Sequence, residues 1–360
     1  MKKQLTRVLL ATSMAAVLWS CNQSDPAPKG DYVRGVFAIN EGNFTQNNGA
    51  ISYFAREQNT AEADLFSKVN GRTLGGGVQG YTVQGETGLI LVDNTAAGQD
   101  KIEIVNSNTF ESVASLGAPD IENPREVVTN GANKAYITCW GANPDYSYKT
   151  GYIAIVDLTT NKVIKKINIA SGPENLIYHN NKVYVGVVSY GGGKSLTVIN
   201  TTTDEVAQTV NFDASPAPVG IDANGKLWLS AGSRAVRINA DSYAAEANLV
   251  LTPTANKSAG NLELSADGRT IYYVLSYYDA NFVAHGETYK FGIADTQVNT
   301  AAPFINRYFT GLTVDPAQGL IYAAVTPSYA QAGYAIRYRT DGTLVDSIRV
   351  GVAPTGFYFR

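Results

Sequence analysis

The chain has 360 residues, of which 44% are hydrophobic and 16% charged, and its formal net charge at pH 7 is −3. So few charges, together with 34 Gly and 22 Tyr, exclude a disordered protein and favour an all-β secreted one. The mildly acidic balance, with no basic run after residue 30, excludes nucleic-acid binding, which requires clustered Lys and Arg.

The first twenty residues have the pattern of a secretory signal peptide. Three basic residues, Lys2, Lys3 and Arg7, precede an apolar stretch over residues 8–18. This stretch is too short to cross a bilayer as a permanent helix. We therefore predict that residues 1–20 are removed, which takes away three positive charges and changes the net charge from −3 to −6.

The signal ends in a sequence that resembles a bacterial lipobox. Leu18 stands three residues before Cys21 and Ser20 stands directly before it, although Trp19 between them is atypical. The resemblance implies that the Cys21 thiol is lipidated and that residues 21–32 form a flexible tether. The protein would then be an outer-membrane lipoprotein of the cell envelope, on either the surface or the periplasmic side. The other interpretation is an ordinary secretory signal followed by an incidental Cys.

From residue 33 onward, a unit built only of strands recurs every 40 to 50 residues, roughly. Each clear copy opens on a Pro, and the first three lead through a Gly or Asn turn into an apolar strand; weaker copies begin near residues 78, 259 and 309. Such a period predicts an all-β fold, a seven-bladed β-propeller with four antiparallel strands, A to D, in each blade. The clear openings are Pro124-Arg125-Glu126-Val127, Pro173-Glu174-Asn175-Leu176, Pro218-Val219-Gly220-Ile221 and Pro354-Thr355-Gly356-Phe357.

The two ends of this region predict how the ring closes. The chain enters on a B-type strand, residues 35–40, and finishes on a lone A-type strand, residues 354–359. We predict that three strands from the N-terminal end and this last strand form one blade. Residues 33–360 would then be a single propeller domain without a free sheet edge.

The connections distinguish the two faces of the predicted propeller. The A–B connections, such as residues 224–225 and 267–268, are tight turns, whereas most B–C connections, such as 41–49, 141–150 and 276–287, are long. In a four-stranded meander the B–C and D–A connections share one face. One face should therefore carry the long loops, and the other should be plain.

We predict a ligand-binding surface on the face with the long loops, because aromatic and amide side chains there offer broad contact and adaptable hydrogen bonds. The competing interpretation is that Tyr is simply common in secreted β proteins. The second residues of the openings should lie near the channel mouth: Gln79, Arg125, Glu174, Val219, Gly260, Thr310 and Thr355. Of these, Arg125 and Glu174 either pair with each other or present charge to a ligand. The predicted ligand-binding residues are Phe44, Asn47, Arg125, Trp140, Tyr146, Tyr148, Glu174, Tyr190, Tyr277, Tyr278, Phe282 and Tyr329.

The sequence predicts no catalytic residue, metal site or cofactor. His179 is expected in an A–B turn and His285 in a B–C loop, on opposite faces, which argues against a two-His metal site. Calcium-binding and phosphate-binding loop motifs and a Ser-nucleophile motif are absent. His285 with Asp279 and Glu287 is the one cluster suited to acid–base work, and a solvated loop is the simpler interpretation. Cys139, in an apolar strand, is expected to be a buried, inert thiol.

The repeat resembles the YVTN/YncE-like propellers, whose units share a Pro-x-Gly opening, an Asp-Gly or Asn-Gly turn and an apolar strand. Residues 37–44, Phe-Ala-Ile-Asn-Glu-Gly-Asn-Phe, and 48–53, Asn-Gly-Ala-Ile-Ser-Tyr, are similar to the first blade of propeller lipoproteins of Bacteroidota. The resemblance implies a position beside a TonB-dependent outer-membrane transporter, and some members of that group capture cobalamin. A propeller fold by itself does not specify a function.

The sequence leaves three hypotheses of function open. The first is a non-enzymatic, membrane-anchored propeller that captures a nutrient, such as cobalamin or another corrinoid, for a TonB-dependent transporter. The second is a protein-interaction scaffold in a cell-envelope complex. The third is a lactonase-type propeller enzyme, which requires carboxylates or His around the channel mouth. At the aligned positions there, only Arg125 and Glu174 are charged.

Overall fold

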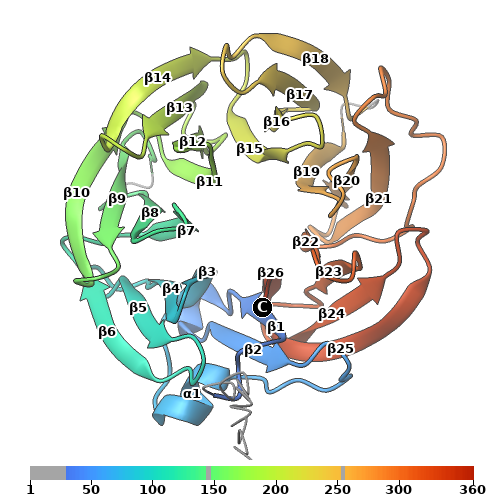
Figure 1. Cartoon of the computed structure of the whole chain (residues 1–360). Helices are drawn as coiled ribbons and strands as arrows, with labels where there is room; N and C mark the ends of the chain where they lie inside the picture. The colour runs from blue at the N-terminus through green and yellow to red at the C-terminus, as the bar shows by residue number, and fades with distance from the viewer. Residues whose placement is uncertain (1–29, 143–146, 253–255) are drawn as a thin grey trace, which may run out of the picture.

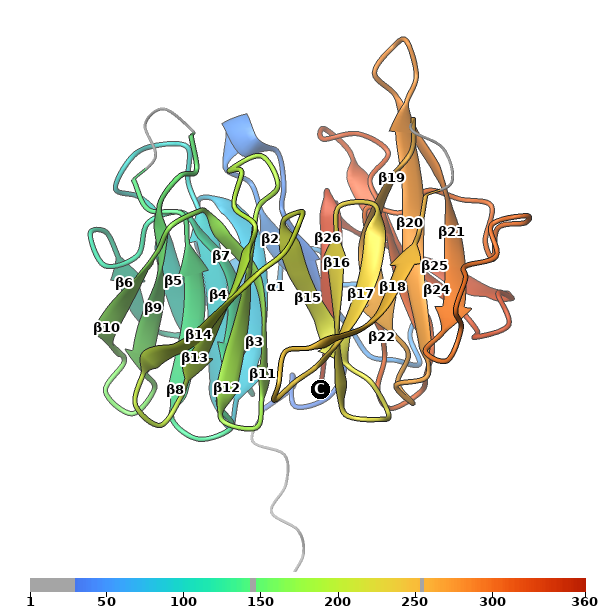
Figure 2. The same ribbon diagram turned by 90° about the horizontal axis from the view of Figure 1, so that it is seen from above.

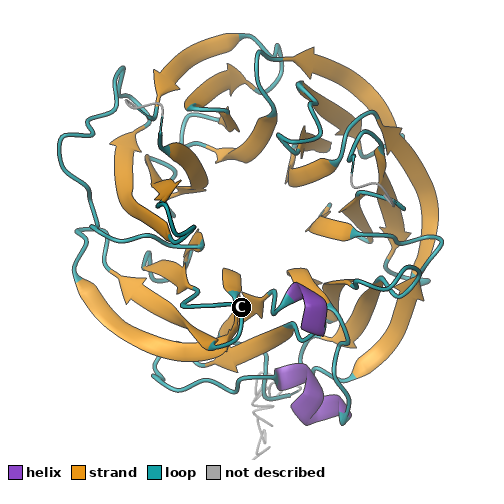
Figure 3. Ribbon diagram, turned by 180° about the vertical axis from the view of Figure 1, so that it is seen from behind, coloured by secondary structure: helices purple, strands orange, loops and turns teal. Residues whose placement is uncertain are grey.

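The computed structural model describes residues 30–142, 147–252 and 256–360. Within these ranges the chain is almost entirely β, and seven antiparallel sheets stand around a central axis as the blades of a propeller (Figure 1). The described helical segments are a 3-10 turn, η1 (Phe44–Gln46), and a short helix, α1 (Leu65–Asn70), both beside the first blade (Figure 3). The predicted fold is confirmed. Residues 1–20, Cys21 and the tether up to residue 29 lie outside the described ranges.

Each blade is a meander whose strands follow one another from the channel outward. Five blades have four strands, and two have three. From the channel outward, the strands of the seven blades are β26 (Pro354–Phe359), β1 (Val36–Asn40) and β2 (Ala50–Phe54); β3 (Gly77–Gln84), β4 (Thr87–Asp93), β5 (Lys101–Asn106) and β6 (Ser112–Gly117); β7 (Pro124–Thr129), β8 (Lys134–Cys139), β9 (Gly151–Asp157) and β10 (Lys162–Ile169); β11 (Pro173–His179), β12 (Lys182–Val187), β13 (Ser195–Asn200) and β14 (Glu205–Asn211); β15 (Pro216–Ile221), β16 (Lys226–Ala231), β17 (Arg234–Asn239) and β18 (Ala245–Val250); β19 (Ser258–Leu264), β20 (Thr270–Tyr278) and β21 (Ala284–Gly292); and β22 (Gly311–Val314), β23 (Ile321–Val325), β24 (Ala332–Tyr338) and β25 (Leu344–Val352).

The ring closes through the two ends of the chain, as the sequence predicts. Strand β26 pairs antiparallel with β1, with Phe357 opposite Ala38. A buried ion pair also links the first blade to the last: Arg56 Nε lies 2.6 Å from Asp315 Oδ2, and the Asp315 side chain is fully buried. The closure therefore combines main-chain pairing with a charge contact between blades that are distant in sequence.

The third N-terminal strand expected in the closing blade is reduced to one bridge, between Tyr53 and Glu62. The segment after β2 is polar and ends at Asp64, whose carboxylate accepts hydrogen bonds from the Ser67 N–H at 3.0 Å and the Ser67 hydroxyl at 2.6 Å. Such a cap starts a helix rather than a strand. The first two residues of α1 are buried in the core between the first two blades.

The hydrophobic core lies between neighbouring blades and is largest around the B strands. In three consecutive B strands the third residue is a fully buried aromatic: Tyr136, Tyr184 and Trp228. The two tyrosines connect adjacent blades, because the Tyr136 hydroxyl donates to Asp204 Oδ1 at 2.6 Å and the Tyr184 hydroxyl donates to the Ala240 carbonyl at 2.9 Å. Pairing each buried hydroxyl in this way avoids the cost of an unsatisfied polar group. Cys139 is also buried and free, as predicted.

The two faces of the ring differ, and the difference matches the sequence-based expectation. The B–C and D–A connections lie together on what we call the loop-rich face, and the A–B and C–D turns lie on the opposite, turn face (Figure 2). The first described residues lie on the turn face, because the Tyr32 N–H donates to the Asn108 carbonyl, between β5 and β6, at 3.0 Å. Arg360 Nη1 donates to the Tyr32 carbonyl at 3.1 Å. No helix among the described residues has the length and hydropathy to cross a membrane.

Candidate functional site

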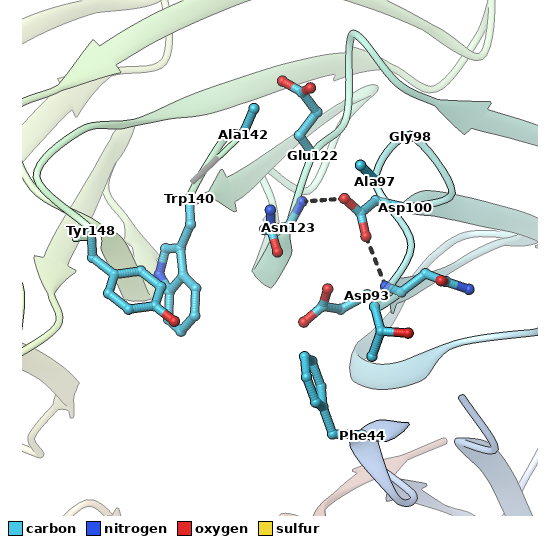
Figure 4. A pocket seen from close by; sticks show the side chains of 12 residues that line it. Phe44, Asp93, Ala97, Gly98, Asp100, Glu122, Asn123, Trp140, Ala142 and Tyr148 are labelled. Carbon is cyan, nitrogen blue, oxygen red and sulfur yellow. Dashed lines mark hydrogen bonds between the residues drawn. The ribbon is translucent and has the colours of Figure 1, made fainter. Parts of the chain in front are cut away.

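Loops from three neighbouring blades surround a cavity of about 250 Å³ on the loop-rich face (Figure 4). Phe44 follows β1, Asp93 ends β4 and residues 94–100 follow it, and Trp140 and Tyr148 follow β8. The segment before β7 contributes residues 122–123. Aromatic side chains from two blades therefore face polar side chains from the blade between them.

The aromatic wall continues as a cluster that includes Tyr190. The ring centroids of Trp140 and Tyr148 are 4.4 Å apart and those of Tyr148 and Tyr190 are 4.9 Å apart, both in edge-to-face geometry. The guanidinium carbon of Arg125 lies 4.0 Å from the Trp140 ring centroid, which is a cation–π contact. The structure thus brings together four of the residues that the sequence predicts.

Arg125 also forms the predicted ion pair with Glu174. The distance from Arg125 Nη2 to Glu174 Oε1 is 3.2 Å, and Nη1 lies 3.7 Å from Asp93 Oδ2. Burial lowers the pKa of Arg125, but Glu174, followed by Asp93 and Glu41, raises it overall, so the side chain stays cationic. Of the two interpretations of Arg125 and Glu174, the mutual ion pair is the one observed.

The polar wall was missed by sequence reasoning, and two neighbouring carboxylates dominate it. Asp100 accepts hydrogen bonds from the backbone N–H of Asn94 at 2.7 Å and of Asn123 at 3.0 Å. Asp93 is only 8% exposed, and its carboxylate points into the cavity (Figure 4). Burial raises the pKa of Asp93 to about 6, against the lowering effect of Arg125 and with a further rise from Asp100. The available sequence signal was an apolar strand ending in Asp-Asn directly before a B–C loop.

Phe44 is held at the cavity by its local hydrogen bonds. Asn43 caps η1 by accepting a hydrogen bond from the Thr45 N–H at 3.0 Å, and Asn47 ends it in a left-handed conformation with φ of 51°. Asn47 then makes two hydrogen bonds with Thr95 of the next blade, at 2.9 and 3.1 Å. Asn47, predicted as a ligand-binding residue, therefore joins the two loops that hold the Phe44 wall.

Three predicted aromatic residues do not line the cavity but lie on a hairpin that projects from the loop-rich face (Figure 2): Tyr277, Tyr278 and Phe282. The long loop expected over residues 276–287 is mostly strand, because β20 and β21 extend to a turn over residues 279–283. Tyr and Phe favour strands, and the Asp279 carboxylate closes the turn by accepting from the Asn281 N–H at 2.8 Å and the Val283 N–H at 2.9 Å.

Tyr329 and the cluster around His285, also predicted on this face, do not come together in one site. Tyr329 lies next to the first blade, where its carbonyl accepts a hydrogen bond from Asn43 Nδ2 at 3.1 Å. Tyr146 lies outside the described residues. The cluster around His285 is split, because His285 Nε2 lies 3.0 Å from Asp279 whereas Glu287 pairs with Lys257 at 2.7 Å.

The central channel forms a second cavity, of about 480 Å³. Glu41, Glu126 and Glu263 line it in addition to the aligned positions, which corrects the expectation that only Arg125 and Glu174 are charged there. A break in the pairing register within β7 and another within β19 let consecutive residues reach the channel. Burial raises the pKa of Glu126 to about 8 and that of Glu263 to about 7. Five of the seven expected second-position residues line the channel: Gln79, Arg125, Glu174, Thr310 and Thr355.

The described residues contain no group of three or more His, Cys, Asp or Glu side chains placed to hold a metal ion. The described residues of the two cavities offer aromatic stacking, hydrogen bonding and charge, and burial raises the pKa of three of their carboxyl groups, Asp93, Glu126 and Glu263, toward or above neutral pH.

The chain belongs to the family described as domain of unknown function (DUF5074), whose match covers residues 34–359. No curated protein matches the sequence. Among solved structures, a quinonprotein alcohol dehydrogenase-like protein from Bacteroides thetaiotaomicron is 17% identical with a TM-score of 0.64, covering 92% of this chain and 79% of its own. A candidate 6-phosphogluconolactonase from Bacteroides fragilis is 12% identical with a TM-score of 0.59, covering 92% and 99%. Hydrazine synthase of Kuenenia stuttgartiensis is 16% identical with a TM-score of 0.55, covering 77% and 88%. At these identities the likeness concerns the fold.

Proposed function

We propose that this protein is a non-enzymatic ligand-binding propeller that captures a small molecule on its loop-rich face. The observation that carries the proposal is the cavity between Phe44 and the Trp140 cluster, which loops of three blades build together. Pockets with aromatic walls and a few directed polar groups are the usual form of small-molecule sites. Its position on one face of a closed ring leaves the scaffold rigid and the loops free to specify the ligand.

The finer version of the proposal is capture of a corrinoid for a TonB-dependent transporter, which rests on the family resemblance of the first blade. The cavity of about 250 Å³ would take one substituent of so large a ligand. The body of the ligand would lie on exposed rings nearby, such as Tyr190, which is 64% exposed. Calorimetry of the purified protein with cobalamin and with cobinamide tests this version. If neither compound gives a heat of binding at micromolar concentration, the corrinoid version is refuted, and capture of another small molecule remains the proposal.

The membrane anchor is part of the same proposal. Lipidation of Cys21 would hold the propeller on the outer membrane, on either the surface or the periplasmic side. Radiolabelled palmitate should be incorporated into the wild-type protein in cells and not into Cys21→Ser. Equal incorporation into both proteins, or none into the wild type, refutes the anchor without bearing on the cavity.

The projecting hairpin is the observation that favours a scaffold function. Phe282 at its tip is 86% exposed, and Tyr278 beside it is 69% exposed, as expected of residues that await a partner surface. Pull-down from membranes separates the two functions. A transporter recovered alone favours capture, whereas a stable assembly that is lost in Phe282→Ser favours scaffolding.

An enzyme of the lactonase type is the third candidate, and the channel glutamates are the observation that favours it. A carboxyl with its pKa near neutrality suits general acid–base work, and Glu126 and Glu263 both meet this condition. Hydrolysis of 6-phosphogluconolactone above the uncatalysed rate, abolished in Glu126→Gln, would establish this function and refute the non-enzymatic proposal. The absence of such activity would remove the candidate.

A further inference from the structure

The cavity on the loop-rich face has a charge pattern that its role as a pocket does not by itself require. Its described lining includes three acidic side chains, Asp93, Asp100 and Glu122, and no Lys, Arg or His. The nearest cation, Arg125, is already engaged by Glu174 at 3.2 Å. The described part of the pocket is therefore negatively charged, in addition to being aromatic.

Asp93 is the acidic side chain that is directed into the cavity. It is only 8% exposed, and its described partners are the neighbouring Asp100 carboxyl group and the Arg125 guanidinium. Arg125 Nη1, at 3.7 Å, is beyond hydrogen-bond distance. Asp100 beside it, in contrast, accepts two backbone N–H groups. A buried carboxylate whose nearest cation is shared with Glu174 has little charge compensation, and in this site it is directed into open space between Trp140 and Phe44 (Figure 4).

The walls around Asp93 are suited to a cation. Aromatic rings attract ammonium and guanidinium groups through their π faces, and Trp140 already binds one such group, the Arg125 guanidinium at 4.0 Å. Phe44 and Tyr148 provide two further rings on the lining of the same cavity. An anionic ligand, such as a phosphosugar, would be repelled by three acids at this position.

We propose that this cavity binds the cationic ammonium group of a small molecule, with Asp93 as counter-ion and Phe44, Trp140 and Tyr148 as an aromatic cage. The proposal rests on the proposed function, because it names the ligand class of that same site. It assigns Asp93 a binding role that the resemblance to propeller lipoproteins does not supply.

A pair of probes with the same shape and different charge tests the proposal. Choline carries a trimethylammonium group, and 3,3-dimethylbutan-1-ol carries an uncharged tert-butyl group in its place. Titration of the full protein is followed by calorimetry and by tryptophan fluorescence, and comparison with Trp140→Phe separates the signal of Trp140 from those of Trp19 and Trp228. We expect choline to bind with a dissociation constant of millimolar order or below, and the neutral isostere to bind at least about tenfold more weakly.

Variants assign the effect to the site. Asp93→Asn should weaken choline binding at least about tenfold and change binding of the neutral isostere little, because it removes the charge and keeps the shape. The matched control is Glu205→Gln on the outer strand β14, whose side chain is 73% exposed, and it should leave both affinities unchanged. An equal loss in the control would attribute the effect to the net charge of the protein and overturn the proposal.

Three further outcomes overturn the cation site, and one combination of results distinguishes it from the proposed function. Equal affinity for the two probes, no choline binding up to about 10 mM, or unchanged choline binding in Asp93→Asn refutes it. If choline fails in one of these ways while a corrinoid or another uncharged ligand binds and loses affinity in Trp140→Phe, capture stands and the cation site falls. If no ligand of any charge perturbs Trp140, both fall.

Discussion

Replacing Asp93 with Asn should stabilise the protein at neutral pH, because the wild-type carboxylate is buried at an energetic cost. The pKa of Asp93 is raised from 3.8 to about 6, chiefly by burial. Between these two pH values the folded state binds more protons than the unfolded state, so stability falls as the pH rises. At about 1.36 kcal/mol per pKa unit, the loss from this residue reaches about 3 kcal/mol above pH 6. Asn avoids this loss because it does not ionise.

Urea denaturation of the wild type and Asp93→Asn at about pH 3.5 and pH 8 measures the effect. We expect equal stability at the acid pH and an advantage of up to about 3 kcal/mol for the variant at the alkaline pH. Glu205→Gln, at an exposed position, should stay within about 0.5 kcal/mol of the wild type at both. A variant that is less stable than the wild type at pH 8, or a difference that does not depend on pH, would refute the reasoning about Asp93.

Three further predictions concern the fold. Phe357→Ala in the closing strand should cost about 3–5 kcal/mol in urea denaturation, whereas the same change at exposed Phe282 should cost less than about 0.5 kcal/mol; similar losses would contradict the role of β26 in closure. Arg56→Gln leaves buried Asp315 without its cation and should cost about 3–5 kcal/mol, and a loss below about 1 kcal/mol would show that the ion pair is not needed. Burial raises the pKa of Cys139 to about 12, so iodoacetamide should modify this thiol only after unfolding, as read by peptide mass spectrometry; modification of the native protein would contradict its burial.

The repeat predicts the fold well because each blade repeats the same pattern of apolar strand and turn. The closing position of residues 354–359 and the division into two faces both follow from the phase of that pattern, and both are confirmed. The outer strand of the first blade does not follow from it. The Asp64 cap starts helix α1 at the place where the repeat predicts a strand. The segment before it is polar and lacks the apolar residues that would favour a strand there.

The aromatic residues of the candidate site could be predicted from the sequence, whereas its acidic residues could not. Trp140, Tyr148 and Phe44 could be found because long loops with aromatic residues stand out in a chain of tight turns. Asp93 could not, because its significance depends on what surrounds it: the burial of its side chain and a cation, Arg125, that it shares with Glu174. Glu126 was missed for a different reason, since a bulge in β7 changes which residues face the channel and the spacing of residues does not show bulges.

The position of Tyr32 and Arg360 on the turn face limits how the protein would sit at a membrane. Between Cys21 and Gly30 the chain can span at most about 30 Å, so a lipid on Cys21 would keep the turn face near the bilayer. The cavity would then open toward the side of the molecule farthest from the lipid. A transporter embedded in the same membrane would have to extend beyond the full height of the propeller, or the propeller would have to tip over on its tether before ligand could pass between them.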